Sequence, residues 1–297
     1  MMILLTLIGI LLAYKLLFYL YRVLLALIKK PVDIKKKFNT DTVIITGASS
    51  GVGRQLALLC AKQGLNIIGV GRDEQKLKCV AEECRKERIE FTEVAQDLGY
   101  VDSSDKVFEV TKGHRVGALF LVHGGYYINK LSDKDDENII MDVNSSFLTE
   151  ILLVKKFINQ SNNCGTVTFV SSVNSFMPIP FAQIYVAGKC GVNQFFECMQ
   201  MEGLLNGITF QTINASYIKD TDIARGNLYL KKSTEIGMAP IKVAEAILST
   251  AGTNYEFDLG YQAVLFHFIK FLIPKFILNP ILTKISNKIL EMKKKYE

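Results

Sequence analysis

A tyrosine and a lysine stand four residues apart in SSVNSFMPIPFAQIYVAGKC, residues 171–190. If this stretch is helical, Tyr185 and Lys189 lie on one face, with about 5–6 Å between their Cβ atoms. An ammonium group at that distance favours the phenolate and lowers the tyrosine pKa from about 10. A tyrosine tuned in this way can give or take a proton near neutral pH. The pair predicts general acid–base chemistry. Considered alone, it also fits two polar residues exposed on the surface of an amphipathic helix.

Two serines precede the pair at the end of an apolar run. Ser171 and Ser172 close GTVTFVSS, residues 165–172, which has the composition of a buried strand. A hydroxyl at that strand end can hold a substrate carbonyl oxygen while Tyr185 protonates it. Serine, tyrosine and lysine together therefore predict chemistry at a carbonyl group.

A glycine-rich turn, TGASSGVG at residues 46–53, follows the first apolar run of the chain. Gly47, Gly51 and Gly53 would let a pyrophosphate approach the N-terminus of the next helix, and Ser49, Ser50 and Arg54 would add phosphate contacts. The spacing is G-x-x-x-G-x-G and not the G-x-G-x-x-G fingerprint. Plain turn chemistry is the alternative, but the position between a strand and a helix favours a nucleotide site.

The next strand ends at Gly71-Arg72, where a dinucleotide enzyme selects its cofactor. A carboxylate there suits the ribose 2′-hydroxyl of NAD, whereas an arginine suits a 2′-phosphate. Asp73 precedes a helical run and is interpreted as its N-cap. Arg72 and Lys76 therefore favour NADPH, and Asp97, after the third strand, is expected at the adenine.

Short apolar runs alternate with longer stretches that carry apolar residues at helical spacing. Such alternation predicts one α/β domain over residues 38–257, a Rossmann-type doubly wound parallel sheet. The expected strands are 42–47, 66–71, 89–95, 117–124, 165–172 and 207–215.

The N-terminal 28 residues carry only two charges, Lys15 and Arg22. At about 1.5 Å per residue a helix of this length can cross a bilayer core of about 30 Å. We therefore expect a transmembrane anchor at residues 1–30, and the basic residues after it indicate a catalytic domain that faces the cytoplasm. Because Lys15, Arg22 and Lys29 recur every seven residues, a helix that lies in the membrane interface is the alternative.

The C-terminal segment, residues 258–297, is apolar but is interrupted by Lys270, Pro274, Lys275 and Pro280. No uninterrupted apolar stretch within it is long enough to cross a membrane as a helix. We expect a membrane-associated tail, interfacial or re-entrant, and a soluble cap or a homodimer contact is the alternative. The final KKYE resembles the dilysine signal of endoplasmic reticulum membrane proteins.

Charge and cysteine content exclude other classes of function. The net charge is +6, but the lysines gather at the two ends beside apolar segments, which suits anionic lipid and not nucleic acid. The six cysteines show no CxxC pair and no histidine at metal spacing. We therefore expect no metal site, no nucleic-acid partner and reduced, buried thiols.

Residues 40–255 resemble the short-chain dehydrogenase/reductase family, on the glycine turn, MDVNSS and the YxxxK pair. The resemblance implies a catalytic set of Asn144, Ser172, Tyr185 and Lys189. Hydride would pass from the nicotinamide to a carbonyl carbon while Tyr185 donates the proton, Lys189 orients the ribose and Asn144 holds a water. The implied NADPH-binding residues are Gly47, Ser49, Ser50, Gly51, Gly53, Arg72, Lys76, Asp97, Tyr185 and Lys189.

Within the family the chain most resembles the 3-ketodihydrosphingosine reductases, through GRDEQK at 71–76, QMEG at 200–203 and the apolar ends. This likeness implies a lipid-like ketone substrate. A 3-ketoacyl-CoA reductase of fatty-acid elongation and a retinoid or steroid dehydrogenase are close alternatives. A non-catalytic membrane scaffold with a Rossmann fold is the alternative from another class.

The chain departs from the family pattern in two places. His123 stands where the family has an asparagine after the fourth strand; we interpret it as a core-edge imidazole and not as a catalytic base. After the sixth strand, Ile218-Lys219 replaces a proline pair, and Ile223 replaces a threonine, with Thr221 nearby.

Apolar side chains between the serines and the tyrosine are expected to form a lip beside the reacting carbonyl. They are Phe176, Met177, Ile179 and Phe181.

Overall fold

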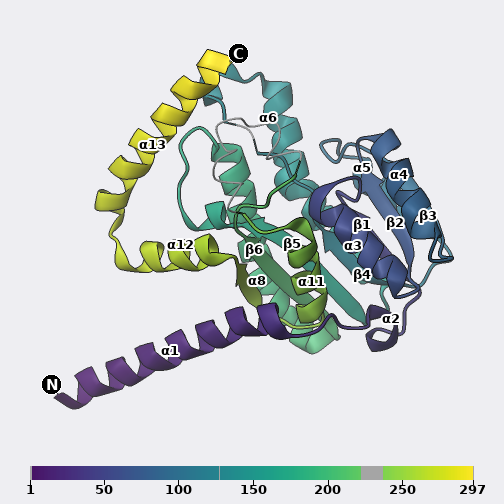
Figure 1. Ribbon diagram of the computed structural model, residues 1–297, viewed down its shortest axis with the longest axis horizontal. Coiled ribbons are helices and arrows are strands. Elements are labelled where there is room, and N and C mark those ends of the chain that lie inside the picture. The colour runs from purple at the N-terminus through teal and green to yellow at the C-terminus, as the bar shows by residue number, and fades with distance from the viewer. Residues whose placement is uncertain (1, 127, 222–236, 297) are drawn as a thin grey trace.

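The computed structural model describes residues 2–126, 128–221 and 237–296. Seven parallel strands form one sheet in the order β3-β2-β1-β4-β5-β6-β7 (Figure 1). The strands are β1 (Thr42–Thr46), β2 (Asn66–Gly71), β3 (Phe91–Ala95), β4 (Val116–Leu121), β5 (Gly165–Ser172), β6 (Ile208–Ala215) and β7 (Glu256–Leu259). The predicted doubly wound parallel sheet is confirmed.

Helices cover both faces of the sheet, which explains why the strands read as continuous apolar runs. One core lies under α3 (Gly51–Lys62), α4 (Glu74–Arg85) and α11 (Pro240–Thr250). The other lies under α5 (Ser103–Glu109), α7 (Thr149–Gln160) and α8 (Gln183–Asn206). The shorter elements are α2 (Ile34–Lys37), α6 (Asp136–Val143), the 3-10 turns η1 (Leu131–Asp133) and η3 (Val173–Phe176), and the π-helical turn η2 (Asn144–Leu148).

β7 was not among the predicted strands. It has four residues, pairs in parallel with β6 and crosses the expected domain boundary at 257/258. A run this short, with only Phe257 and Leu259 as apolar members, carries no periodicity that separates a strand from a loop.

The strand order reverses between β1 and β4, because β1 lies between β2 and β4. In open α/β sheets ligands bind at such a switch point, outside the carboxyl ends of the strands. Thr46, Leu121 and Ser172 end β1, β4 and β5, so this topology brings the glycine turn and the serines to one edge.

The N-terminal helix α1 (Met2–Ile28) projects from the domain (Figure 1). Its segment Gly9–Ala26 is long and apolar enough to cross a membrane, by length and composition. The first turns expose side chains such as Leu7, Ile10 and Leu11, whereas Tyr19 and Ala26 are buried against the domain. α1 is therefore both an apolar projection and, near its C-terminal end, part of the packed structure.

The C-terminal segment forms α12 (Tyr261–Leu272) and α13 (Lys275–Tyr296), joined at Pro274, on the same side of the view as α1 (Figure 1). Leu278 of this arm packs with Phe176 and Met177, which are buried. The expected lip is therefore only partly correct: Phe176 and Met177 lie under the arm, while Phe181 lines the cavity described below.

The six cysteines are all free thiols, as expected. Cys60 and Cys84 are buried, and the other four are exposed. The prediction of buried thiols was therefore wrong for Cys79, Cys164, Cys190 and Cys198, which stand on outer surfaces.

Candidate active site

The glycine turn passes close enough to itself to require glycine. Gly47 has φ +68°, a left-handed conformation that other residues rarely adopt. A Cβ on Gly53 would lie 2.1 Å from the carbonyl oxygen of Gly47. Because α3 begins at Gly51, its first amide groups lie at the turn, where a helix N-terminus favours an anion.

One cavity of about 1220 Å³ runs along the carboxyl edge of the sheet and joins the two predicted halves of the site. It is lined by all eight of the predicted cofactor residues outside α8: Gly47, Ser49, Ser50, Gly51, Gly53, Arg72, Lys76 and Asp97. Ser172, Tyr185 and Lys189 line the same cavity, and so does Thr221. Ile223 lies outside the described residues.

The end of β2 is arranged as the sequence indicated. Arg72 lies 3.7 Å from the carboxylate of Asp97, and both face the cavity. Asp73 is the N-cap of α4 and accepts a hydrogen bond from the backbone N–H of Lys76 at 3.0 Å. Its carboxylate therefore caps the helix, as expected, although Asp73 also lines the cavity with Arg72 and Lys76.

Arg54 does not contribute to the cavity, which corrects the expectation that it contacts phosphate. Its guanidinium group donates to both carboxylate oxygens of Glu83 on α4, at 2.8 and 2.7 Å. Helical phase explains this: Arg54 falls on the side of α3 that faces α4, and not on the side that faces the glycine turn.

Ser172 and Tyr185 are in contact. The hydroxyl of Ser172 lies near enough to the phenol of Tyr185 to lower its pKa, and its oxygen accepts from the backbone N–H of Asn174 at 3.2 Å. The neighbouring Ser171 is buried, and its hydroxyl finds no hydrogen-bond partner among the described residues. The geometry therefore supports Ser172 as the serine that works with Tyr185.

Burial raises the pKa of Tyr185, and the hydrogen bond from Ser172 opposes the rise. The expectation that Lys189 lowers this pKa is not met in the structure. The consequence is a phenol that is protonated at neutral pH, which is the form that donates a proton in a reduction.

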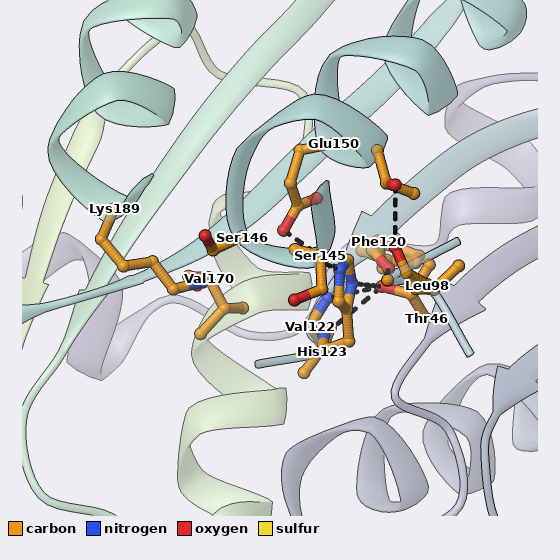
Figure 2. Close-up of polar contacts among 12 residues, drawn as sticks. Thr46, Leu98, Phe120, Val122, His123, Ser145, Ser146, Glu150, Val170 and Lys189 are labelled. Carbon is orange, nitrogen blue, oxygen red and sulfur yellow. Dashed lines mark hydrogen bonds and ion pairs between the residues drawn. The ribbon is translucent and has the colours of Figure 1, made fainter. Parts of the chain in front are cut away.

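Lys189 is 4% exposed and directs its ammonium group into the interior. It donates to the carbonyl oxygen of Val170 at 2.9 Å (Figure 2). Its Nζ lies 4.3 Å from the centre of the Phe169 ring. Burial lowers the pKa of Lys189, and the negative charge of Glu150 opposes that shift. The ammonium is thus fixed under the end of β5, beside the cavity.

Asn144 stands at the start of the π-helical turn η2 and is buried. Its side-chain amide donates to the carbonyl oxygen of Gly99 at 2.9 Å. Asn144 is not among the residues that line the cavity, whereas Ser145 and Ser146 are. The role of Asn144 in a water relay stays a prediction. Its hydrogen bond to Gly99 holds α6 and η2 to the loop after β3.

His123 contacts residues of three elements, β1, η2 and α7 (Figure 2), and it lines the cavity. Its Nδ1 lies 2.8 Å from Thr46 Oγ1 and its Nε2 lies 2.9 Å from the carbonyl oxygen of Ser145. Nε2 is also 3.5 Å from the carboxyl of Glu150. Burial, and then the charge of Lys189, lower the pKa of His123 to about 3, so the ring is neutral. The interpretation as a core-edge imidazole fits these contacts.

Thr46 and Glu150 were missed by the sequence reasoning. Thr46 accepts hydrogen bonds from the backbone N–H of Val122 at 3.0 Å and of His123. Burial raises the pKa of Glu150, and the charge of Lys189 opposes the rise. A single glutamate in an otherwise amphipathic helix resembles a solvated residue, so the sequence carries no signal for this one.

His123→Asn is expected to weaken the acid sensitivity of folding. Burial lowers the pKa of His123 from 6.5 to about 3 in the folded state. Between pH 6.5 and pH 3 the unfolded chain therefore binds a proton at His123 and the folded chain does not. Wild-type stability is therefore lost as the pH falls below about 6.5, by about 2 kcal/mol at pH 5. Urea unfolding at pH 7 and pH 5 measures the loss, with His114→Asn as control. An equal loss in His123→Asn and wild type would contradict the assignment.

Known proteins share both the sequence pattern and the fold. Residues 41–228 match the family model described as short chain dehydrogenase. "Dehydrogenase/reductase SDR family member 7B" of Xenopus laevis is 28% identical over 230 residues, which cover 71% of this chain and 70% of that protein. "Very-long-chain 3-oxoacyl-CoA reductase" of Bos taurus is 26% identical over 223 residues, which cover 72% and 69% of the two chains.

A solved 7beta-hydroxysteroid dehydrogenase superposes with a TM-score of 0.76 at 21% identity, and the match covers 86% of this chain and 100% of that one. At this identity the likeness concerns the fold alone. With a family model that matches 188 consecutive positions, 41–228, the chain belongs to the short-chain dehydrogenase family.

Proposed function

We propose that this protein uses NADPH to reduce a ketone at C3 of a long-chain lipid, with 3-ketodihydrosphingosine as substrate and dihydrosphingosine as product. The observation that carries the proposal is the single cavity in which the glycine turn, Arg72, Ser172, Tyr185 and Lys189 all meet. Lipid access is supported by the apolar helices α1 and α12–α13 at the side of the domain.

The residues present fit a nicotinamide dinucleotide. The turn can fold this tightly only because Gly53 lacks a Cβ, which would meet the backbone of Gly47. The turn lines the cavity, where its amides suit a pyrophosphate, and Arg72 adds a positive charge at the end of β2. When bound, NADPH supplies the hydride. Tyr185 gives its phenolic proton to the substrate oxygen, while Ser172 holds that oxygen and Lys189 keeps a fixed positive charge under the end of β5, beside the cavity.

Arg72→Ala is expected to weaken NADPH binding about 10- to 100-fold and to leave NADH binding within about 2-fold, because only NADPH carries the 2′-phosphate that a guanidinium recognises. Fluorescence titration of the full-length protein with each cofactor measures the two affinities. Lys78→Ala, on the helix α4 that follows Arg72 and paired with Glu74, is the control. Equal losses for the two cofactors would undo the assignment to NADPH.

The apolar helices support a membrane location. We propose that α1 anchors the protein in the endoplasmic reticulum membrane with the domain on the cytoplasmic side. A long-chain ketone partitions into the bilayer, so an anchored reductase would meet it at high local concentration. Protease protection of a C-terminal tag in sealed microsomes tests the orientation, since a cytoplasmic domain is digested without detergent.

A 3-oxoacyl-CoA is the second candidate substrate, favoured by the similarity to the bovine reductase with that printed name. NADPH oxidation by membranes that carry the protein, with 3-ketodihydrosphingosine, a 3-oxoacyl-CoA, a ketosteroid and retinal in parallel, separates the candidates. We expect turnover of 3-ketodihydrosphingosine. Turnover of only the CoA ester, the steroid or retinal would overturn this substrate, and no turnover of any carbonyl compound would favour a non-catalytic scaffold.

A further inference from the structure

A buried carboxylate ties the anchor helix to the sheet. The phenol of Tyr19 on α1 donates to Asp258 Oδ2 on β7 at 2.7 Å. Asn214 on β6 donates from Nδ2 to Asp258 Oδ1 at 2.9 Å, and His267 Nδ1 on α12 lies 3.0 Å from Oδ2. Asp258 is 4% exposed and Asn214 is fully buried. Both carboxylate oxygens are thus engaged, and one of the partners comes from α1.

The same hydrogen bonds continue from the sheet to the active site. Asn193 on α8 donates from Nδ2 to Asn214 Oδ1 at 3.2 Å and to Ser175 Oγ at 3.0 Å. Ser175, in η3, donates to the carbonyl oxygen of Ser172 at 2.7 Å. An unbroken chain of side chains therefore runs from the anchor helix to the backbone of the serine that contacts Tyr185.

The direction of every bond in this chain is set by the carboxylate. Asp258 can only accept, so Asn214 turns its NH₂ group toward Asp258 and its oxygen toward Asn193. Asn193 must then donate, and Ser175, which accepts from Asn193, has its own proton left for Ser172. Asn193 Oδ1 has no partner among the described residues, which is the cost of this single orientation.

A second set of contacts holds α1 in place at the same point. Arg22 donates to the backbone carbonyl of Glu256 at 3.0 Å, and its guanidinium lies over the rings of Phe18 and Tyr19. Tyr19 also packs against His267, with 4.9 Å between ring centres. The turn of α1 that carries Tyr19 is therefore fixed in position and not merely tethered.

We propose that α1 is a part of the catalytic domain as well as an anchor, and that Tyr19, Asp258, Asn214 and Asn193 are positioning residues for the reaction. They hold the carbonyl of Ser172, and with it the direction of the Ser172 hydroxyl toward Tyr185. The kinetic consequences rest on the proposed reductase activity, whereas the coupling of α1 to the segment after β5 does not.

Tyr19→Phe in the full-length, membrane-bound protein tests the proposal. It removes one hydroxyl and keeps the ring, and Tyr14→Phe, at a 63% exposed tyrosine of the same helix, is the control. We expect kcat to fall about 5-fold in Tyr19→Phe, because small misplacements of a reacting group cost rate steeply, while NADPH affinity and membrane retention stay unchanged. Wild-type kcat in Tyr19→Phe would overturn the proposal.

A double-mutant cycle tests whether Tyr19 and Asn193 act through the same chain of hydrogen bonds or independently of each other. Asn193→Leu breaks the chain in the middle without touching α1. If Tyr19 acts through Asn193, Tyr19→Phe causes no further loss of kcat in the Asn193→Leu background. Losses that multiply would show that Tyr19 acts by another route, and would contradict the proposal.

Hydrogen exchange tests the coupling without any substrate. We expect the backbone amides of residues 171–177 to exchange several-fold faster in Tyr19→Phe than in wild type, and unchanged in Tyr14→Phe. Unchanged exchange in Tyr19→Phe would overturn the coupling. Faster exchange, in a protein that reduces no ketone, would support the coupling and place the failure in the proposed function.

Discussion

Tyr185→Phe is expected to lower kcat by about 1000-fold while NADPH binding stays within about 2-fold of wild type. In the proposed reaction the phenol is the proton donor, and its raised pKa keeps it protonated at neutral pH. Phenylalanine keeps the ring and removes only the hydroxyl, so the packing of α8 is preserved. Steady-state NADPH oxidation and a fluorescence titration of the cofactor measure the two quantities separately.

Tyr100→Phe is the control for this experiment, because Tyr100 is exposed and lies outside the cavity. Its kcat should equal that of wild type. If Tyr185→Phe kept more than about a tenth of wild-type turnover, a different group would have to protonate the substrate, since one general acid is typically worth at least about 100-fold.

Lys189→Met should lower kcat/KM by about 100-fold or more, because a fixed positive charge beside the reacting groups is lost in a site of low polarity. Methionine keeps an unbranched side chain over the Phe169 ring but cannot donate to the carbonyl of Val170. NADPH affinity should fall as well if the ammonium orients the nicotinamide ribose. Kinetics at several NADPH concentrations separate the two losses.

The exposed Lys155 on α7 provides the matched substitution, Lys155→Met, which should leave kcat/KM unchanged. Thermal unfolding of both variants checks the fold. A folded Lys189→Met enzyme with wild-type kcat/KM would remove Lys189 from the mechanism.

The parts of the site that were predictable from the sequence are carried by short, local patterns. Gly47 has φ +68°, and a Cβ on Gly53 would lie 2.1 Å from the carbonyl oxygen of Gly47. Other residues fit poorly at both positions, so these two glycines mark the turn in the sequence itself. Tyr185 and Lys189 are helical neighbours, and five of the seven strands begin within one residue of their predicted start. Strands buried on both faces leave the clearest pattern.

The parts that were missed depend on contacts between distant residues. Tyr19 and Asp258 are 239 positions apart, and nothing in either neighbourhood indicates that one will meet the other. Glu150 becomes a buried neighbour of His123 only once α7 packs under β4. The misplacement of Phe176 and Met177 has the same origin, since the arm that buries them lies about 100 residues later.

The transfer of deuteride from labelled NADPH to a ketone is the most direct test of the central claim. Membranes that carry the full-length protein receive 3-ketodihydrosphingosine and NADPH deuterated at C4 of the nicotinamide, and mass spectrometry examines the alcohol. We expect one deuterium on the carbinol carbon with wild type, from one of the two C4-labelled epimers, and no labelled alcohol with Tyr185→Phe. Absence of labelled alcohol with both epimers, or equal labelling by Tyr185→Phe, would contradict hydride transfer to this ketone at the Ser172–Tyr185–Lys189 site.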